Sequence, residues 1–180
     1  MKHTLAGLLL LALAVWVRLA GLPAAQVLGD SVGPWWVAQG GPPYLEPHAP
    51  PFGWMLYVPY GAILMVADSM REAVAGLQVL HALAAPLAAL LAWRLRPALG
   101  GALLAGLAAA LSSGLVWGGL SGAQDYLAPV WIGLVALGVT APKTRWGPVL
   151  AMVSMAGALM SHPLSLCALP LLVLLPLLAQ

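Results

Sequence analysis

The sequence predicts an all-α, polytopic membrane protein in which about six helices span the bilayer. Of its 180 residues, 62% are hydrophobic and only 7% are charged, whereas a soluble domain carries about 25% charged residues. Apolar runs recur along the chain, and a helix needs about 20 such residues to cross a bilayer. One long polar interruption, Leu22–Gly53, separates the first run from the others. We therefore expect a single transmembrane domain over residues 1–180.

The apolar runs give the limits of the expected spans. They cover residues 5–22, 73–93, 99–120, 126–141, 146–160 and 164–179. The first run resembles a signal peptide, but Arg18 interrupts its core and Pro23 disfavours cleavage, so we interpret it as an uncleaved span. Segment 54–67 is apolar but too short to span. We expect it to form a juxtamembrane helix within an outer-face loop, residues 23–72.

The distribution of charged residues predicts which ends of the spans face the cytoplasm. Lys and Arg are enriched in cytoplasmic loops. With the N-terminus in the cytoplasm and segment 54–67 not spanning, the basic residues inside are Lys2, Arg94, Arg96, Lys143 and Arg145, and the acids outside are Asp30, Glu46, Asp68, Glu72 and Asp125. If segment 54–67 spanned, four of those basic residues would lie outside. We therefore expect a multi-pass protein of the cell (inner) membrane.

Several classes of function are disfavoured. The net charge of +2 comes without a basic stripe, which argues against nucleic-acid binding. The single cysteine, Cys167, excludes an internal disulfide and a cysteine-based metal cluster. The chain has no Walker loop, GxGxxG, HExxH or GxSxG pattern, which argues against a nucleotide-driven pump or a familiar membrane metalloprotease.

Two acids are the candidate catalytic residues. Asp30 follows the first span by a few residues, and Asp125 begins the fourth span from the same face. A carboxylate at the membrane surface can accept a proton from a hydroxyl or bind a divalent cation such as Mg²⁺ or Mn²⁺. Each acid has an alternative role as a helix N-cap. For Asp30 the two roles are compatible.

The other polar residues each have a structural alternative. Arg71 is the basic residue of the outer polar segments and a candidate for binding a phosphate, with Asp68 and Glu72 as its alternative partners. Arg18 could snorkel to the interface or pair with an outer acid. His81, within a span, is either functional or hydrogen-bonded to a neighbouring helix. Possible substrate contacts are His48, His162, Trp35 and Trp54. Structural turns and an interfacial aromatic belt explain these four residues as well.

The order of these residues resembles the N-terminal half of a GT-C glycosyltransferase, of the kind related to protein O-mannosyltransferases and aminoarabinose transferases. The resemblance rests on the late Arg18, the segment Leu28-Gly29-Asp30, the Pro-rich segment 48–54, Arg71 at the second span, and Asp125 in the second outer loop. The segment Ser161-His162-Pro163 is also similar. The chain departs from many relatives in having Ser31, and not a second acid, after Asp30.

The resemblance implies an activity and partners. The family transfers sugars from polyprenyl-phosphate lipids on the outer face of the membrane. Asp30 would then be the general base, Asp125 the second acid near the site, and Arg71 the contact to the donor phosphate. A metal ion bound by Asp30 and Asp125 stays open as an alternative partner of that phosphate. Because family members continue for several more spans, the resemblance also implies a further subunit or a C-terminal region beyond residue 180.

We therefore expect a membrane glycosyltransferase that uses a lipid-phosphate-linked sugar. The alternative is a non-catalytic membrane scaffold or assembly subunit that keeps the same fold. A transporter is disfavoured because the spans contain few ionisable groups from which to build a coupled pathway.

Overall fold

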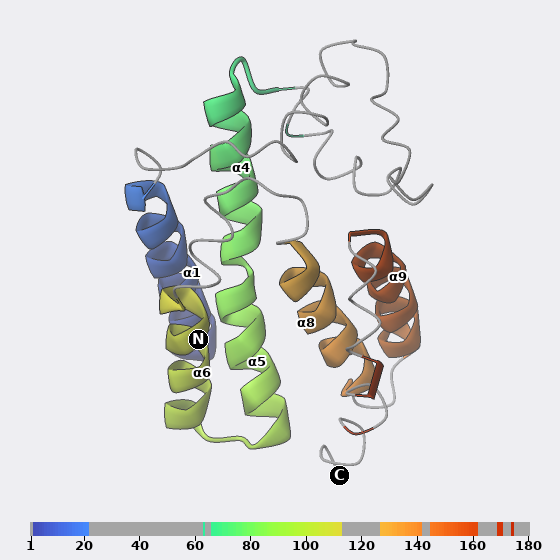
Figure 1. Cartoon of the computed structure of the whole chain (residues 1–180). Coiled ribbons are helices and arrows are strands. Elements are labelled where there is room, and N and C mark those ends of the chain that lie inside the picture. Colours follow the sequence, from blue (N-terminus) through green and yellow to red (C-terminus); the bar gives the residue numbers. More distant parts are fainter. Residues whose placement is uncertain are drawn as a thin grey trace.

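Helices form all the regular elements in the part of the chain that the computed structural model describes, which comprises residues 2–21, 63, 66–112, 127–141, 145–161, 169–170 and 174. The elements are α1 (Lys2–Gly21), α4 (Met70–Ala82), α5 (Ala84–Leu95), α6 (Leu99–Leu111), α8 (Ala128–Val139) and α9 (Trp146–Ser161) (Figure 1). The expected all-α fold class is confirmed for these residues.

Helix α4 begins at a side-chain cap. The Ser69 hydroxyl accepts a hydrogen bond from the backbone N–H of Glu72 at 3.2 Å. The Glu72 carboxylate in turn accepts one from the backbone N–H of Asp68 at 2.9 Å. A Ser followed three residues later by Glu satisfies N–H groups that have no partner inside the helix. Ser69 and Glu72 therefore stabilise the start of α4.

Helices α4 and α5 follow each other with one irregular residue between them, Leu83. Pro86 explains the irregularity, because it has no N–H to donate to the carbonyl of Ala82 four residues earlier. The chain tightens here, and the Leu83 N–H donates to the Leu80 carbonyl at 3.1 Å. The pair nevertheless gives one apolar stretch of 25 residues, Arg71–Leu95.

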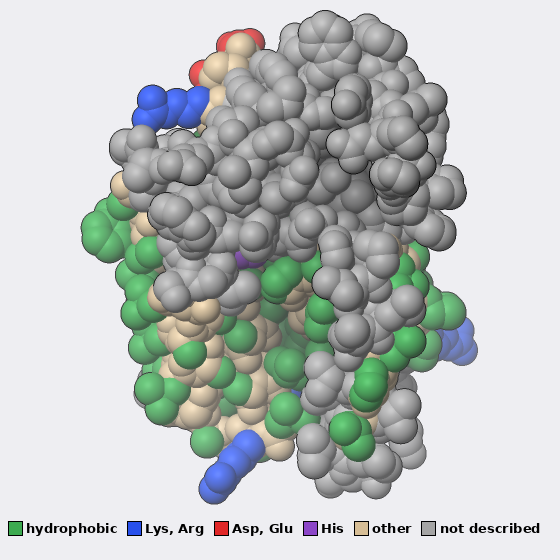
Figure 2. All heavy atoms as spheres, in the orientation of Figure 1, with side chains coloured by type: hydrophobic (Ala, Val, Ile, Leu, Met, Phe, Trp, Pro, Cys, Tyr) green, Lys and Arg blue, Asp and Glu red, His purple; other side chains and the backbone are tan. Residues whose placement is uncertain are grey.

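The described helices run alternately up and down, so the bundle has two distinct ends (Figure 1). The start of α1 lies at the end of α5, where the rings of His3 and Trp93 are 4.5 Å apart. One end, which we call the acidic end, has Asp68 and Glu72 beside the start of α4. The other, which we call the basic end, has Arg94 and Arg96 at the end of α5 and Arg145 before α9. Figure 2 shows the acidic side chains at the top, with a basic side chain beside them, and further basic side chains at the bottom and at the right.

Small residues let the helices approach closely. Ala14 of α1, Ala82 and Ala85 of α4 and α5, and Ala110 of α6 form one cluster, and each is fully buried. Between α8 and α9 the closest approach is at Gly138, where an added Cβ would lie 2.6 Å from the backbone N of Ala151. Packing through small residues is typical of helices in membranes.

Arg94 joins α5 to α8 at the basic end. Its Nη1 donates to the carbonyl oxygen of Leu137 at 2.7 Å. Leu137 lies in the last turn of α8, where helix carbonyls have no partner within the helix. A cation at a helix C-terminus also interacts favourably with the helix dipole. Arg94 is therefore a structural contact as well as a surface charge.

The exterior of the bundle is apolar. Large hydrophobic side chains are exposed along α1, α6 and α9, among them Leu5, Leu8, Leu9, Trp16, Leu104, Leu111, Met152 and Val153. Figure 2 shows hydrophobic side chains along much of the described surface. Soluble monomers rarely expose contiguous apolar surface of this kind. Such an exterior is typical of helices that contact lipid.

Two helices are long and apolar enough to cross a membrane, namely His3–Ala20 and Arg71–Leu95. They match the expected spans 5–22 and 73–93. Helices α6, α8 and α9 are apolar but have 13, 12 and 16 residues, or about 18–24 Å at 1.5 Å per residue. That is less than the bilayer core of about 30 Å, so the described helices do not support six spans. The sixth expected span, 164–179, lies mostly outside the described residues.

The expected juxtamembrane helix, 54–67, is described only at its end. The backbone N–H groups of Val66 and Ala67 both donate to the Ile63 carbonyl, at 3.2 and 3.0 Å. Ile63 packs against a buried cluster of Ala73, Leu77 and Leu127. This end of the segment therefore packs on α4, while the rest of loop 23–72 up to residue 62 lies outside the described residues.

Replacing Gly138 tests the close approach of α8 and α9. We expect Gly138→Ala to lower the free energy of unfolding by about 1–3 kcal/mol, the usual cost of overpacking, because its Cβ would meet backbone atoms of Ala151 and Gly147 at 2.6 and 2.7 Å. The control is Gly133→Ala, whose Cβ would meet Leu87 at 3.4 Å and whose helix propensity rises. Unfolding in mixed detergent micelles, followed by circular dichroism, measures both. Equal stability of the two variants would contradict the close approach.

Candidate buried cation site

Three polar side chains are buried where α1, α4 and α6 meet, and we call them the buried polar cluster: Arg18, Gln78 and His81. Arg18 and Gln78 are 0% exposed and His81 is 2% exposed. Polar and charged groups are costly to bury in an apolar interior unless they are paired. In membrane helices such residues mark functional positions more often than elsewhere.

The sequence brings Arg18 inward through helical spacing. Leu10, Ala14 and Arg18 follow one another at intervals of four residues and are all buried, so they share the inner face of α1. Gln78 and His81 lie three residues apart and therefore share a face of α4. The alanines beside them leave room for the long arginine side chain.

The Arg18 guanidinium binds three groups on three helices. Its Nε donates to His81 Nδ1 at 3.4 Å. Its Nη1 donates to the carbonyl oxygen of Ala14 at 3.0 Å and to that of Ala110 at 3.3 Å. The Ala110 carbonyl is in the last turn of α6, where helix carbonyls need partners from outside the helix. Arg18 therefore holds α1, α4 and α6 together at one point.

The contact with Arg18 determines which ring nitrogen of His81 carries the proton. An arginine carries only donors and stays charged. His81 can accept at Nδ1 only if that nitrogen bears no proton, so the ring is neutral with its proton on Nε2. The partners of Arg18 in the described part of the chain are therefore neutral groups, a ring nitrogen and two carbonyl oxygens.

One nitrogen of the Arg18 guanidinium, Nη2, donates no hydrogen bond within the described residues. Within the described residues, Arg18 Nη2 is buried and makes no hydrogen bond, and no described carboxylate pairs with Arg18. A buried charge without a counter-charge costs several kcal/mol. The geometry and the charge together suit an anion with acceptor oxygens.

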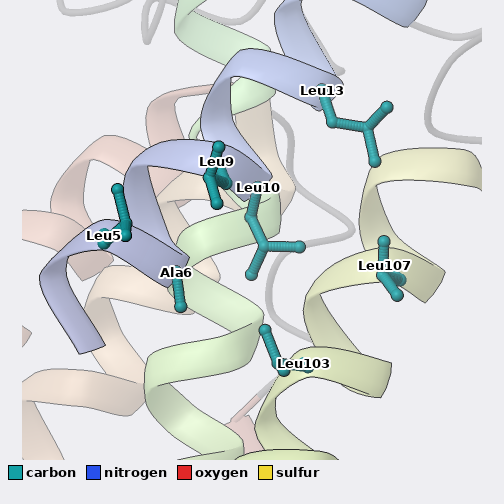
Figure 3. A pocket seen from close by; sticks show the side chains of 7 residues that line it. All are labelled: Leu5, Ala6, Leu9, Leu10, Leu13, Leu103 and Leu107. Carbon is teal, nitrogen blue, oxygen red and sulfur yellow. The ribbon is translucent and has the colours of Figure 1, made fainter. Parts of the chain in front are cut away.

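A groove lies between α1 and α6 (Figure 3). Its volume is about 400 Å³, and its lining is apolar throughout: Leu5, Ala6, Leu9, Leu10 and Leu13 from α1, and Leu103 and Leu107 from α6. The groove ends at Leu13 and Leu107. These residues lie about one helical turn before Arg18 and the Ala110 carbonyl that it binds.

Most of the residues that the sequence singled out lie outside the described residues. These are Asp30, His48, Trp35, Trp54, Asp125 and His162. Arg71 is described. It is exposed in the first turn of α4 at the acidic end, and no described residue forms an ion pair or hydrogen bond with its side chain. Of its two alternative partners, Asp68 and Glu72, the second also accepts a hydrogen bond at the helix start.

Arg18 corrects a sequence-based expectation. The snorkelling interpretation is wrong, because the side chain points into the bundle and is 0% exposed. Pairing with an outer acid is not seen within the described residues. For His81, hydrogen bonding to a neighbouring helix is confirmed. Gln78 was not singled out, although its spacing from His81 on an apolar helix was a usable signal.

No metal centre is visible in the described part of the chain, where no three His, Cys, Asp or Glu side chains gather. The predicted ligands of a divalent ion, Asp30 and Asp125, are not among the described residues.

Comparisons with known proteins give no match: no family model, no curated protein and no solved structure is similar to the chain.

The energetic role of Arg18 can be separated from that of His81. We expect His81→Leu to lower the free energy of unfolding by about 1–3 kcal/mol, because it removes an acceptor from a buried cation. We expect Arg18→Met to be neutral or stabilising, because apolar residues of similar volume often replace buried charges without loss.

A double-mutant cycle tests this prediction. His81→Leu should cost clearly less in the Arg18→Met background than alone, measured by unfolding in mixed micelles. An equal cost in both backgrounds would show that the two side chains are not energetically coupled.

Proposed function

We propose that the chain is a multi-pass membrane glycosyltransferase of the GT-C type, which moves a sugar from a polyprenyl-phosphate donor to an acceptor on the outer face. One observation carries the proposal. In Figure 1, α1 and α6 end, and α4 and α8 begin, toward the upper side of the bundle, with the end of α6 and the start of α8 at about mid-height. The segments that contain Asp30 and Asp125 therefore connect helix ends on one side.

The proposed topology places the acidic end outside and the basic end in the cytoplasm. Arg94, Arg96 and Arg145 belong to one end, and the acids Asp68 and Glu72 lie with Arg71 at the other. The larger number of arginines at the first end supports this orientation, because Lys and Arg are enriched in cytoplasmic loops. The proposed topology keeps the six spans that the apolar runs predict, including residues 164–179.

The proposed reaction needs a base and a stabilised leaving group. Asp30 accepts the proton of the acceptor hydroxyl, whose oxygen forms the new bond to the anomeric carbon of the sugar. The bond from that carbon to the lipid phosphate breaks, and the phosphate leaves with the bonding electrons. Arg71, exposed and at the positive end of the α4 dipole, stabilises the developing charge. Asp125 is the second acid near the site.

Labelling of introduced cysteines tests the topology. In a Cys167→Ser background, Glu72→Cys should react with a membrane-impermeant maleimide applied from the outer side. Arg96→Cys should react only after the membrane is permeabilised. Both positions are exposed at opposite ends of the bundle, so accessibility does not bias the comparison. The reverse labelling pattern would contradict the orientation.

Native mass spectrometry of protein purified from its own membranes tests the function. We expect a sugar-loaded polyprenyl-phosphate to remain bound to Asp30→Asn, because the base is absent and the phosphate contact is kept. Arg71→Ala should lose this lipid by about tenfold or more, which corresponds to one charged hydrogen bond.

The matched control is Arg96→Ala, which removes an exposed arginine at the basic end and should keep the lipid. Absence of any lipid-phosphate adduct from all the proteins would overturn the glycosyltransferase proposal. The non-catalytic scaffold would then be the better interpretation, and a protein subunit in the same spectra would support it.

A further inference from the structure

We propose that the exposed face of α9, together with Arg145, binds an anionic diacyl phospholipid at the basic end of the bundle. The lipid phosphate would bind the Arg145 guanidinium, and the two acyl chains would lie along the helix. The inference rests on the membrane-spanning position of the bundle and does not depend on glycosyl transfer. The site lies at the end opposite to Arg71, the proposed contact to the sugar donor.

Helix α9 packs on α8 with one face and leaves the opposite face exposed. Figure 1 shows it beyond α8, as the last labelled helix on that side of the bundle. Its contacts with α8 involve Gly147 and Ala151, which approach Gly138, and Gly157, which approaches Trp131. The residues on the other side of the helix are therefore those that a lipid can contact.

Five apolar side chains form a continuous exposed surface on α9, which we call the α9 strip: Trp146, Val149, Leu150, Met152 and Val153. All five are exposed, and Trp146 is 77% exposed. Residues three, four and seven positions apart share a face of a helix. Two rows therefore run side by side along the strip, one from Arg145 through Val149 and Met152, the other from Trp146 through Leu150 and Val153.

The two rows suit a lipid with two chains. From Trp146 to Val153 the strip is about 10 Å long at 1.5 Å per residue, and it contains no polar side chain. Each row offers apolar contacts to one acyl chain. This width favours a diacyl phospholipid over a lipid with a single chain.

Arg145 supplies a positive charge where the strip begins. It is exposed and directly precedes α9, and no described residue forms an ion pair or hydrogen bond with its side chain. A guanidinium binds phosphate oxygens through paired N–H groups. A zwitterionic lipid already carries a cation beside its phosphate, so Arg145 favours a lipid with a net negative charge.

Trp146 lies between the charge and the remainder of the strip. Trp side chains are enriched where the hydrocarbon core meets the headgroups. Arg145, Trp146 and the apolar rows thus follow one another in the order of a phospholipid: phosphate, interface and chains. The proposed topology places this end at the cytoplasmic leaflet, which is rich in anionic lipids.

The other arginines of the basic end lack this combination. Nη1 of Arg94 already donates to the Leu137 carbonyl at 2.7 Å. Arg96 is exposed, but Pro97 and Ala98 separate it from α6, and α6 contains no aromatic residue. Arg96 is therefore a matched control for the loss of one positive charge.

The test is a lipid competition followed by native mass spectrometry of the full chain in neutral detergent. The probes are equimolar dioleoyl phosphatidylglycerol and dioleoyl phosphatidylcholine, and we expect the chain to retain more phosphatidylglycerol. Arg145→Gln should lower the ratio of the bound lipids by about fivefold, the contribution of one basic residue near an anionic surface. Arg96→Gln, which removes the same charge, should leave the ratio unchanged.

A pair of tryptophans tests the strip without touching Arg145. Trp146 and Trp16 are 77% and 67% exposed, but Trp16 lies in α1, toward the acidic end. Trp146→Ala should lower the amount of retained phosphatidylglycerol several-fold, whereas Trp16→Ala should not.

Three results would overturn the inference: equal retention of the two lipids by the unchanged chain, equal effects of Arg145→Gln and Arg96→Gln, or displacement of phosphatidylglycerol by equimolar lysophosphatidylglycerol, which has one chain. A protein subunit bound in place of the lipid would also overturn it. Arg71→Ala should keep the preference for phosphatidylglycerol, so failure of the donor site and failure of this site are distinguishable.

Discussion

The burial of one arginine constrains how α1, α4 and α6 pack together. Arg18 is 0% exposed, so its guanidinium has to be partnered inside an apolar bundle. Its contacts reach α1, α4 and α6, and fully buried alanines on these helices leave the space that it occupies. Replacing these alanines with larger side chains would push the helices apart and also displace the acceptors of the cation. Packing and electrostatics therefore constrain the same few positions.

Composition and apolar runs were sufficient to predict the all-α class, the first helix and the long α4–α5 stretch, because these depend on local hydrophobicity. Other features depend on tertiary contacts. The direction of Arg18 follows from which face of α1 meets α4, and a single sequence does not show this. The break at Leu83 could have been predicted from Pro86. The roles of Asp30 and Asp125 remain predictions, since both lie outside the described residues.

The described helices have an apolar exterior, but only His3–Ala20 and Arg71–Leu95 are long enough to cross a membrane. Hydrophobic matching tolerates shorter helices through thinning of the bilayer or through extension of the helix by flanking residues. The close α8–α9 contact at Gly138 shows that the shorter helices are nonetheless packed specifically. Short length in these helices therefore does not mean loose packing.

The bond from Arg94 to the Leu137 carbonyl means that the arginines of the basic end are not equivalent. Arg96 is exposed, so its charge can be moved or reversed with little structural effect. Arg94 also anchors the last turn of α8. Natural or engineered charge reversal at the basic end would be tolerated at residue 96 but would loosen two helices at residue 94. The charge of this end can therefore vary at residue 96, whereas residue 94 is held by its contact with α8.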